Sequence, residues 1–345
     1  MKIIQIYLRM WYSVCMCKFS VKKISLVFSA LFCASLIFAA GSNAGRDIGG
    51  TPVRLWNNIP SMKKYKSVMY YHPAKIDASS AGGPVSDGTV QASNTPKSDT
   101  NDVPQSAPAV IICPGGSYHH LGLYNEGFKS AEWFTQRGVA AFTLRYRTAE
   151  NGFHHPAMLQ DLQRAIQLVR ENAEAYGINP EKLGIIGYSA GGHLVTMGGA
   201  FWQSHDELEK IGIHHSVSLK PDFVIPVYPV VSMQDNIAHR WSRKSLLGKD
   251  RGQNQSQARK DEFSMEMQIP SDMSPTYVVV CKDDNVVDYH NALVLYDALK
   301  EKGINCHLEV YEWGKHGFGM LNGPFMKEFH WNETLWTWLK ENQLL

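Results

Sequence analysis

The chain has 345 residues, of which 44% are hydrophobic, and its 34 basic and 32 acidic residues leave a formal net charge of only +2. No long basic run occurs, so the electrostatic signature of nucleic-acid binding is absent and no nucleic-acid partner is expected. Beyond an N-terminal targeting segment about 300 residues remain, a length that suits one large α/β domain better than several small ones.

The N-terminal 44 residues have the pattern of a signal peptide. Lys22 and Lys23 precede an apolar run from Ile24 to Ala40, and Ser42-Asn43-Ala44 supplies small residues for cleavage. This pattern predicts export to the periplasm or medium, with no membrane contact after cleavage. The apolar run also approaches the length of a bilayer span, so retention as an anchor is the alternative.

Residues 45–345 are predicted to form a single domain with one insertion. From residue 75 to residue 106 the chain consists mostly of Ser, Gly, Asp, Asn, Thr and Pro, which cannot bury enough apolar surface to offset the entropy of ordering. We therefore expect a disordered insertion over 75–106, with a polysaccharide-contacting loop as the alternative. Three cysteines follow residue 44, and this odd number predicts buried thiols at Cys113, Cys281 and Cys306 and no disulfide framework.

After Pro108, short apolar runs alternate with segments of helical periodicity. This alternation predicts an α/β fold with a mainly parallel central sheet and helices on both faces. One helix is expected after Pro156 and up to Gly177, and another over Asn291–Lys302. Strands are predicted at 66–71, Ala109–Cys113, Val139–Tyr146, Leu183–Tyr188, Phe223–Tyr228, Thr276–Cys281 and His307–Tyr311.

The motif with the most specific chemistry is Gly187-Tyr188-Ser189-Ala190-Gly191, which directly follows a predicted strand and precedes a stretch able to start a helix. In that context a tight turn exposes the hydroxyl of a nucleophilic serine, and the flanking glycines make room for the turn. The following helix presents backbone N–H groups to the negative charge that develops during acyl transfer. Ser189 is therefore predicted to be a nucleophile.

A second glycine turn, Cys113-Pro114-Gly115-Gly116-Ser117, follows an earlier predicted strand. It resembles the HGGG-type loop of esterases, with Pro114 in place of the usual histidine and Ser117 in place of the third glycine. Backbone N–H groups of Gly116 or Ser117, together with that of Ala190, are predicted to form an oxyanion hole.

The partners of a nucleophilic serine in this fold follow it in the order acid, then histidine. Asp283 and Asp284 come after the strand Thr276–Cys281, and His316 lies in a glycine-rich loop after the strand His307–Tyr311. His316 is predicted to be the base, whereas the two adjacent aspartates are equivalent on the residues alone.

No metal site or cofactor is predicted. The adjacent pairs His119-His120, His154-His155 and His214-His215 lack the spacing of metal ligands, and no CxxC or HxxxH motif accompanies them. His193, one helical turn after Ser189, is expected to pack in the interior.

These motifs and several further segments resemble the bacterial acetyl-xylan-esterase and feruloyl-esterase-like α/β-hydrolases, which are related to the hormone-sensitive-lipase group. The resemblance covers nearly all of the chain after Pro108 and rests on the segments Ala109–Tyr118, Asn125–Gly127, Leu144–Arg147, Gly187–Leu194, His239–Gly248, Cys281–Val287 and Gly314–Gly319. In that family the second aspartate of the pair belongs to the triad, which favours Asp284.

The resemblance and the export signal imply a secreted serine esterase acting on short acyl esters, mainly acetyl, of xylan or related plant oligosaccharides. General short-chain carboxylesterases, feruloyl esterases and amide hydrolases use the same triad and are the alternatives. A non-catalytic carbohydrate-binding protein is a further alternative of a different class. The stretch from Val231 to Met273 is polar and basic, so it predicts no apolar lid of the lipase type.

Overall fold

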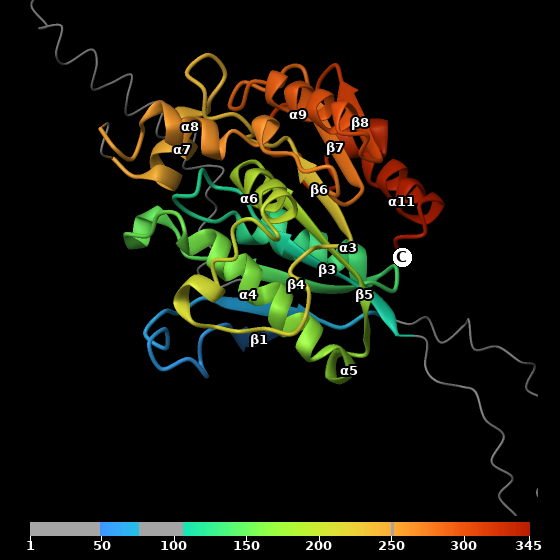
Figure 1. Ribbon diagram of the computed structural model, residues 1–345. Helices are drawn as coiled ribbons and strands as arrows, with labels where there is room; N and C mark the ends of the chain where they lie inside the picture. Colours follow the sequence, from blue (N-terminus) through green and yellow to red (C-terminus); the bar gives the residue numbers. More distant parts are fainter. Residues whose placement is uncertain (1–48, 76–105, 250–251) are drawn as a thin grey trace, which may run out of the picture. The chain divides into compact units, whose positions relative to one another are not determined.

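A mixed sheet forms the centre of the computed structural model, which describes residues 49–75, 106–249 and 252–345 (Figure 1). Within these residues the sheet has eight strands, in the order β1-β2-β4-β3-β5-β6-β7-β8. The strands are β1 (Thr51–Arg54), β2 (Val68–His72), β3 (Ala107–Cys113), β4 (Ala140–Arg145), β5 (Ile178–Tyr188), β6 (Phe223–Val227), β7 (Thr276–Cys281) and β8 (Cys306–Tyr311).

Strand direction divides the sheet into two parts. β1 pairs antiparallel with β2, and β2 pairs antiparallel with β4, whereas all the pairings from β4 to β8 are parallel. The central parallel strands are buried on both faces, as Val110, Ile111 and Ile112 of β3 illustrate. Their continuous apolar runs are typical of a parallel sheet covered by helices on both sides.

β6 contains a proline in the middle of the sheet. The N–H groups of Val224 and Tyr228 donate to the carbonyls of Pro275 and Val279, so every second residue of β6 faces β7. Pro226 occupies the position between these two donors and has no N–H group. The ladder between β6 and β7 therefore lacks one hydrogen bond, and we call this boundary the β6–β7 seam.

Helices cover both faces of the sheet (Figure 1). On one face the rings of Trp133 in α3 and Trp336 in α11 pack together, and Arg137, just after α3, forms an ion pair with Glu333 of α11. On the other, α4 and α6 pack together. The helices are α3 (Lys129–Thr135), α4 (Ala157–Glu171), α5 (Ala173–Tyr176), α6 (Ala190–Ala200), α7 (Arg240–Leu247), α8 (Gln257–Phe263), α9 (His290–Glu301), α10 (Pro324–Phe329) and α11 (Trp331–Glu341).

The strand order reverses at β3, because β4 lies on one side of β3 and β5 on the other. In α/β sheets the carboxyl ends of the strands at such a reversal border a crevice where ligands bind. Cys113 at the end of β3 is in register with Gly187, two residues before Ser189. The sheet therefore brings the glycine turn 114–117 beside the predicted nucleophile.

The predicted α/β-hydrolase fold is confirmed, and each predicted strand has a counterpart within two residues or overlaps a longer one. The helix predicted between Pro156 and Gly177 is instead two helices, because Asn172 leaves the helical conformation (φ −115°, ψ 24°). Cys113 and Cys281 are buried free thiols, and Cys306 is half-buried.

Two predictions fall outside the described residues. They are the signal peptide over 1–44 and nearly all of the insertion over 75–106, and both remain predictions. All described residues fall in one unit that extends over 47–345. Among the helices of this described part, none combines the length and apolar character needed to cross a bilayer.

Candidate active site

Ser189 lies in a sharp turn between β5 and α6, with φ 55° and ψ −116°. This conformation is unfavourable for a residue with a side chain and costs about 1–3 kcal/mol. The glycines on either side make the turn possible. A Cβ added to Gly187 would lie 2.0 Å from the carbonyl oxygen of Gly191, and one added to Gly191 would lie 2.1 Å from that of Cys113. The turn therefore presents the Ser189 side chain at the carboxyl end of the sheet.

His316 and Asp284 reach this serine from the loops after β8 and β7. The distance from Ser189 Oγ to His316 Nε2 is 2.9 Å, and that from His316 Nδ1 to Asp284 Oδ2 is 2.7 Å. Asp284 is an ionised acceptor, so it forms a hydrogen bond at this distance only if Nδ1 carries the proton. Nε2 is then left as the acceptor of the serine hydroxyl. The three side chains form a continuous hydrogen-bonded chain with the geometry of a nucleophile, a base and an orienting acid.

The two adjacent aspartates have different partners. The Asp284 side chain is fully buried, and its second oxygen, Oδ1, accepts the N–H groups of Val286 and Val287 at 2.9 and 3.0 Å. Asp283 is exposed and accepts the backbone N–H of Lys315 at 2.7 Å. Asp284 therefore holds the histidine ring, whereas Asp283 holds the backbone of the loop that carries it.

The residues predicted for the oxyanion hole come from two neighbouring segments, the start of α6 and the turn after β3. Ala190 is the first residue of α6, while Gly116 (φ 125°) and Ser117 (φ 57°) form the turn after β3. Within the described residues no acceptor is recorded for the N–H groups of these three residues. An oxyanion hole requires free N–H groups beside the serine nucleophile. All three residues meet this requirement, and their roles stay predictions.

Sequence reasoning missed the role of Glu126, whose carboxylate forms a hydrogen bond with the backbone of the glycine turn. It lies in a π-helical turn over Leu123–Phe128. Its Oε2 accepts the N–H of Gly115 at 2.6 Å, and its Oε1 accepts the hydroxyl of Tyr228 at 2.9 Å. Burial raises the pKa of Glu126 above its ordinary value, and these two hydrogen bonds counteract the increase.

Tyr228 connects this carboxylate to the base, because its ring packs on His316 with the centroids 4.7 Å apart. Glu126 thus links the glycine turn beside Ser189 to Tyr228, the residue that packs on the His316 ring. The only signal in the sequence was that Asn125–Gly127 belongs to the family resemblance.

His193 is buried, as expected, and both of its nitrogens have partners. Nε2 donates to the carbonyl of Phe263 at 2.8 Å, and Nδ1 accepts the hydroxyl of Tyr118 at the same distance. Burial lowers the pKa of His193 to about 4, although the bond to Phe263 works in the opposite direction. His193 is therefore a neutral structural histidine.

One group in the described part of the chain has potential metal ligands within 4.8 Å of one another, namely Asp206, Glu209 and His215. His215 Nε2 faces Asp206 at 2.8 Å, and Nδ1 faces the carbonyl of Val217 at 2.8 Å. Both ring nitrogens are thus already engaged, one with a carboxylate and one with a backbone carbonyl. The group is therefore an ion pair on the surface.

Comparison with known proteins agrees with this geometry. The chain is 30% identical to the acetylxylan esterase of Xylanibacter ruminicola over 239 residues, which are 68% of this chain and 46% of that protein. It is 32% identical to endo-1,4-beta-xylanase B of Butyrivibrio fibrisolvens over 63% of this chain and 33% of that protein. The chain thus spans less than half the length of these two relatives.

Solved structures show the same fold. The acetyl ester-xyloside bifunctional hydrolase of Caldicellulosiruptor lactoaceticus superposes with a TM-score of 0.68 at 27% identity, covering 88% of this chain and all of that one. An esterase of Thermogutta terrifontis superposes with a TM-score of 0.64 at 19% identity, covering 87% and 97%. The names of these proteins agree with the predicted enzyme class, a carboxylic ester hydrolase.

The sequence profile of the BD-FAE family matches residues 97–299, which is more than half of the chain. This match confirms the family resemblance that the motifs around Ser189 indicated. The chain belongs to the BD-FAE family.

Proposed function

We propose that this protein is a serine esterase that hydrolyses short acyl esters, mainly acetyl, on xylan or related plant oligosaccharides. The observation that carries the proposal is the pair of distances in the Ser189–His316–Asp284 chain, 2.9 and 2.7 Å. A serine hydroxyl is a weak nucleophile until a base removes its proton, and these distances put a base within reach.

In the acylation step Ser189 Oγ attacks the ester carbonyl carbon while its proton passes to His316 Nε2. The carbonyl oxygen becomes an anion that the N–H groups of Ala190 and of Gly116 or Ser117 stabilise. Asp284 stabilises the imidazolium formed in this step. When the intermediate collapses, His316 returns the proton to the departing alcohol oxygen, and an acyl-serine remains.

Deacylation repeats these roles with water as the nucleophile. His316 takes a proton from the water molecule, whose oxygen attacks the acyl carbon, and the same N–H groups stabilise the second oxyanion. The carboxylic acid leaves as the proton returns to Ser189 Oγ. No bound group beyond the protein is needed to balance either step.

The proposed substrate class is supported by the names of the relatives and by the polarity of the site border. The described residues of the stretch 231–273 include α7 and α8, and both helices carry charged side chains. A long acyl chain would find little apolar cover there, whereas saccharide hydroxyls have hydrogen-bond partners.

A substrate panel tests the proposal. We expect the highest kcat/KM on acetyl esters, lower values on butyryl, octanoyl and feruloyl esters, and release of acetate from acetylated xylan. Preference for feruloyl or octanoyl esters would reassign the substrate, and faster cleavage of a matched amide would reassign the reaction. Ser189→Ala should lower kcat by several orders of magnitude, and a folded, fully active Ser189→Ala would refute the serine mechanism.

We also propose that the protein is exported, on the basis of Lys22-Lys23 and the apolar run that follows. Mass spectrometry of protein from the periplasm or medium should find a new N-terminus near Gly45. An intact N-terminus on cytosolic protein would contradict export, and one on membrane-bound protein would indicate a retained anchor.

A further inference from the structure

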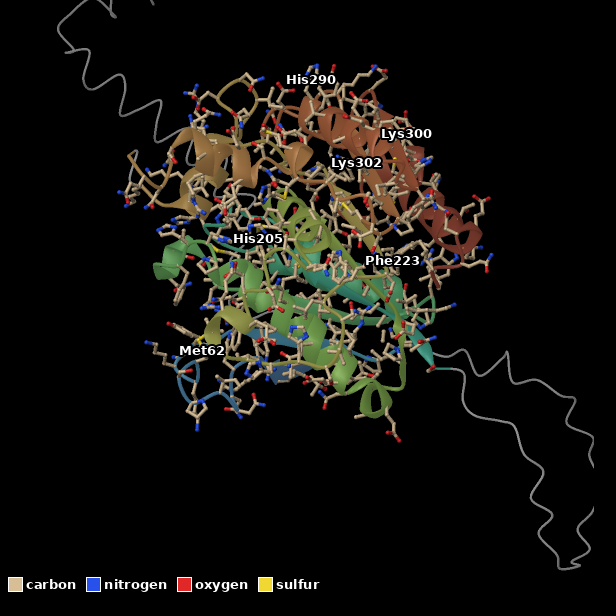
Figure 2. The ribbon with its side chains drawn as sticks, in the orientation of Figure 1. Met62, His205, Phe223, His290, Lys300 and Lys302 are labelled. Atoms are coloured by element: carbon tan, nitrogen blue, oxygen red, sulfur yellow. The ribbon has the colours of Figure 1, made fainter. Side chains whose placement is uncertain are left out.

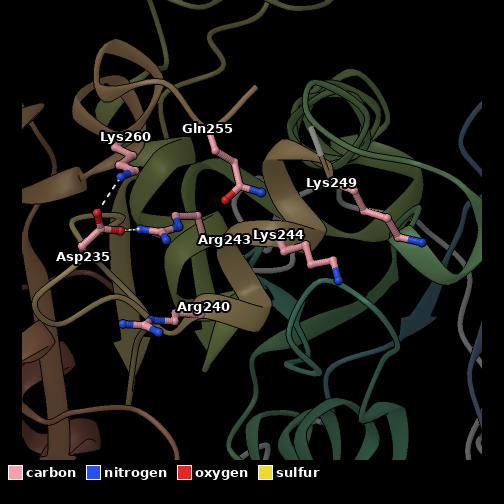
Figure 3. A pocket seen from close by; sticks show the side chains of 7 residues that line it. All are labelled: Asp235, Arg240, Arg243, Lys244, Lys249, Gln255 and Lys260. Atoms are coloured by element: carbon pink, nitrogen blue, oxygen red, sulfur yellow. Dashed lines mark hydrogen bonds and ion pairs between the residues drawn. The ribbon is translucent and has the colours of Figure 1, made fainter. Parts of the chain in front are cut away.

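A cationic pocket lies between α7 and α8 (Figure 3). Its volume is about 670 Å³, within the range of about 300–1,000 Å³ that ligand pockets occupy. Five of its charged side chains are positive and one is negative, although the whole chain carries a net charge of only +2. The lining consists of Asp235, Arg240, Arg243, Lys244, Lys249, Gln255 and Lys260. We call it the α7–α8 pocket.

The single carboxylate does not neutralise this charge. Asp235 accepts from Arg243 Nη1 at 2.6 Å and from Lys260 Nζ at 2.8 Å. In the described part of the chain, Arg240, Lys244 and Lys249 have no ion pair with a carboxylate. Arg243 is only 8% exposed, and its Nη1 also donates to the carbonyl of Met233 at 2.7 Å, so its guanidinium is largely engaged within the protein. The positive charge that the pocket can offer an anion therefore comes mainly from Arg240, Lys244 and Lys249.

The sequence of α7 works against the stability of the helix itself. Arg240 and Lys244 are four residues apart on one face, where like charges repel. Arg240 and Arg243 stand in the first turn, where the helix dipole disfavours cations, and no acidic residue accompanies them there. Basic side chains that destabilise their own helix are expected where they are needed to bind a ligand and not for folding.

The beginning of α7 borders the candidate active site. His239 caps this helix, and its pKa is lowered to about 4 by burial and then by the charge of nearby His316. Trp241 is 40% exposed, and its ring lies 5.5 Å from that of His119 and 6.0 Å from that of His120. These histidines follow Gly116 and Ser117 with one residue, Tyr118, between. The helix that begins at the border of the candidate active site thus also contributes Arg240, Arg243 and Lys244 to the α7–α8 pocket.

We propose that the α7–α8 pocket is a subsite for a carboxylate-bearing sugar, a uronic acid, carried by the saccharide whose ester is hydrolysed at Ser189. This inference rests on the proposed function for the identity of the saccharide. Guanidinium groups bind carboxylates in a planar, bidentate geometry, which Arg240 can offer, with the ammonium groups of Lys244 and Lys249 in the same pocket. The exposed ring of Trp241 offers an apolar face for a sugar between the two sites.

The test compares two acetylated xylo-oligosaccharides that differ only in a uronic acid substituent. We expect kcat/KM of the unaltered protein to be about tenfold higher for the acidic oligosaccharide, because a charge-assisted hydrogen bond contributes at least about 1.4 kcal/mol. In Arg240→Gln/Lys244→Gln this ratio should fall to about one. Added NaCl should lower the ratio in the unaltered protein, because salt screens exposed charges.

Lys302→Gln is the matched control. It removes an exposed positive charge at the C-cap of α9, which Figures 1 and 2 show away from α7 and α8, and Lys302 has no ion pair within the described residues. We expect its ratio to equal that of the unaltered protein. A ratio that the double substitution leaves unchanged, or that Lys302→Gln lowers equally, would overturn the proposal.

A binding measurement separates this inference from the proposed activity. Ser189→Ala should bind the deacetylated acidic oligosaccharide more tightly than the neutral one in titration calorimetry, and Arg240→Gln/Lys244→Gln in that background should abolish the difference. Binding of a phosphorylated saccharide without binding of the uronic acid would overturn the carboxylate assignment. Hydrolysis of p-nitrophenyl acetate reports the esterase separately, so its failure alone would refute the proposed function and leave the subsite standing.

Discussion

Asp283 and Asp284 are neighbours in sequence but hold different parts of the site. Asp284 Oδ2 contacts the His316 ring, whereas Asp283 contacts the backbone of Lys315. We expect Asp284→Asn to lower kcat by about 10³–10⁴-fold, because an amide favours the wrong imidazole tautomer. Asp283→Asn keeps an oxygen for the N–H of Lys315 and should lose far less. Steady-state hydrolysis of p-nitrophenyl acetate measures both, and the reverse order would transfer the orienting role to Asp283.

Glu126 acts on the oxyanion loop and touches no reacting atom. Glu126→Ala removes the acceptor that holds Gly115 N–H at 2.6 Å, so the turn should drift from its position beside Ser189. We expect kcat to fall about 10- to 100-fold with little change in KM, because a displaced donor weakens only the transition state.

Glu126→Gln is the matched control for this position, since its amide oxygen can still accept the bond from Gly115. It should retain most of the activity. If Glu126→Ala kept normal kcat, or if only KM rose, then Glu126 would not position the oxyanion loop.

The sequence predicted chemistry well at the residues whose role depends on local structure. Ser189 needs only the strand, the turn and the helix around it, and all three leave signals in the sequence. The choice between Asp283 and Asp284 depends on which way each side chain turns, and a single sequence does not encode that direction. Glu126 depends on partners 11 and 102 residues away, so no local pattern points to it.

At the scale of elements, β3 and α6 meet with no space between them at Gly191. A Cβ at this position would lie 2.1 Å from the carbonyl oxygen of Cys113 and 2.7 Å from that of Pro114. We expect Gly191→Ala to lower the free energy of unfolding by about 1–3 kcal/mol, because backbone on both sides must move. Activity should fall as well, since the shift separates the two sources of oxyanion donors.

Gly323→Ala is a suitable comparison for this prediction. Its added Cβ would meet no atom within 4 Å, and its φ of −100° is open to alanine. Urea denaturation of both variants measures the difference in stability. Equal stability of Gly191→Ala and the unaltered protein would show that the backbone of β3 can move away from the added Cβ without loss of free energy.

The elements that were predicted by range are those with a clear apolar pattern. β1 has only exposed and half-buried residues, so it lacked the signal of a strand. The helix after Pro156 has an uninterrupted apolar pattern, but the break at Asn172 is a local conformational choice that this pattern does not report. Phe223–Tyr228 was predicted as a strand although Pro226 lies within it, because its other residues are apolar.

At the scale of the whole molecule, buried histidines make stability depend on pH. The pKa of His193 is lowered to about 4 by burial, against about 6.5 in an unfolded chain. Between these values the unfolded state binds a proton that the folded state does not. The contribution of His193 to the free energy of unfolding is therefore fully present above about pH 6.5. It is lost as the pH falls toward 4, and the total loss is about 3 kcal/mol.

Urea denaturation at pH 7, 6 and 5 tests this expectation. His193→Gln removes the titrating group, so its free energy of unfolding should fall less steeply on acidification, by up to about 1.4 kcal/mol per pH unit. Identical slopes in the two proteins would mean that His193 takes up a proton without penalty.

The β6–β7 seam runs through the candidate active site. Ser189, Ala190 and the glycine turn lie on the side of β3 and β5, whereas the loops with Asp284 and His316 follow β7 and β8. Pro226 removes one hydrogen bond from the ladder that joins the two sides, so opening this boundary costs less free energy than opening an intact ladder would. On heating, the base would therefore part from the serine before the sheet as a whole melts. Thermal inactivation of this protein would then begin reversibly, below its melting temperature, while the oxyanion donors remain assembled around an unactivated serine.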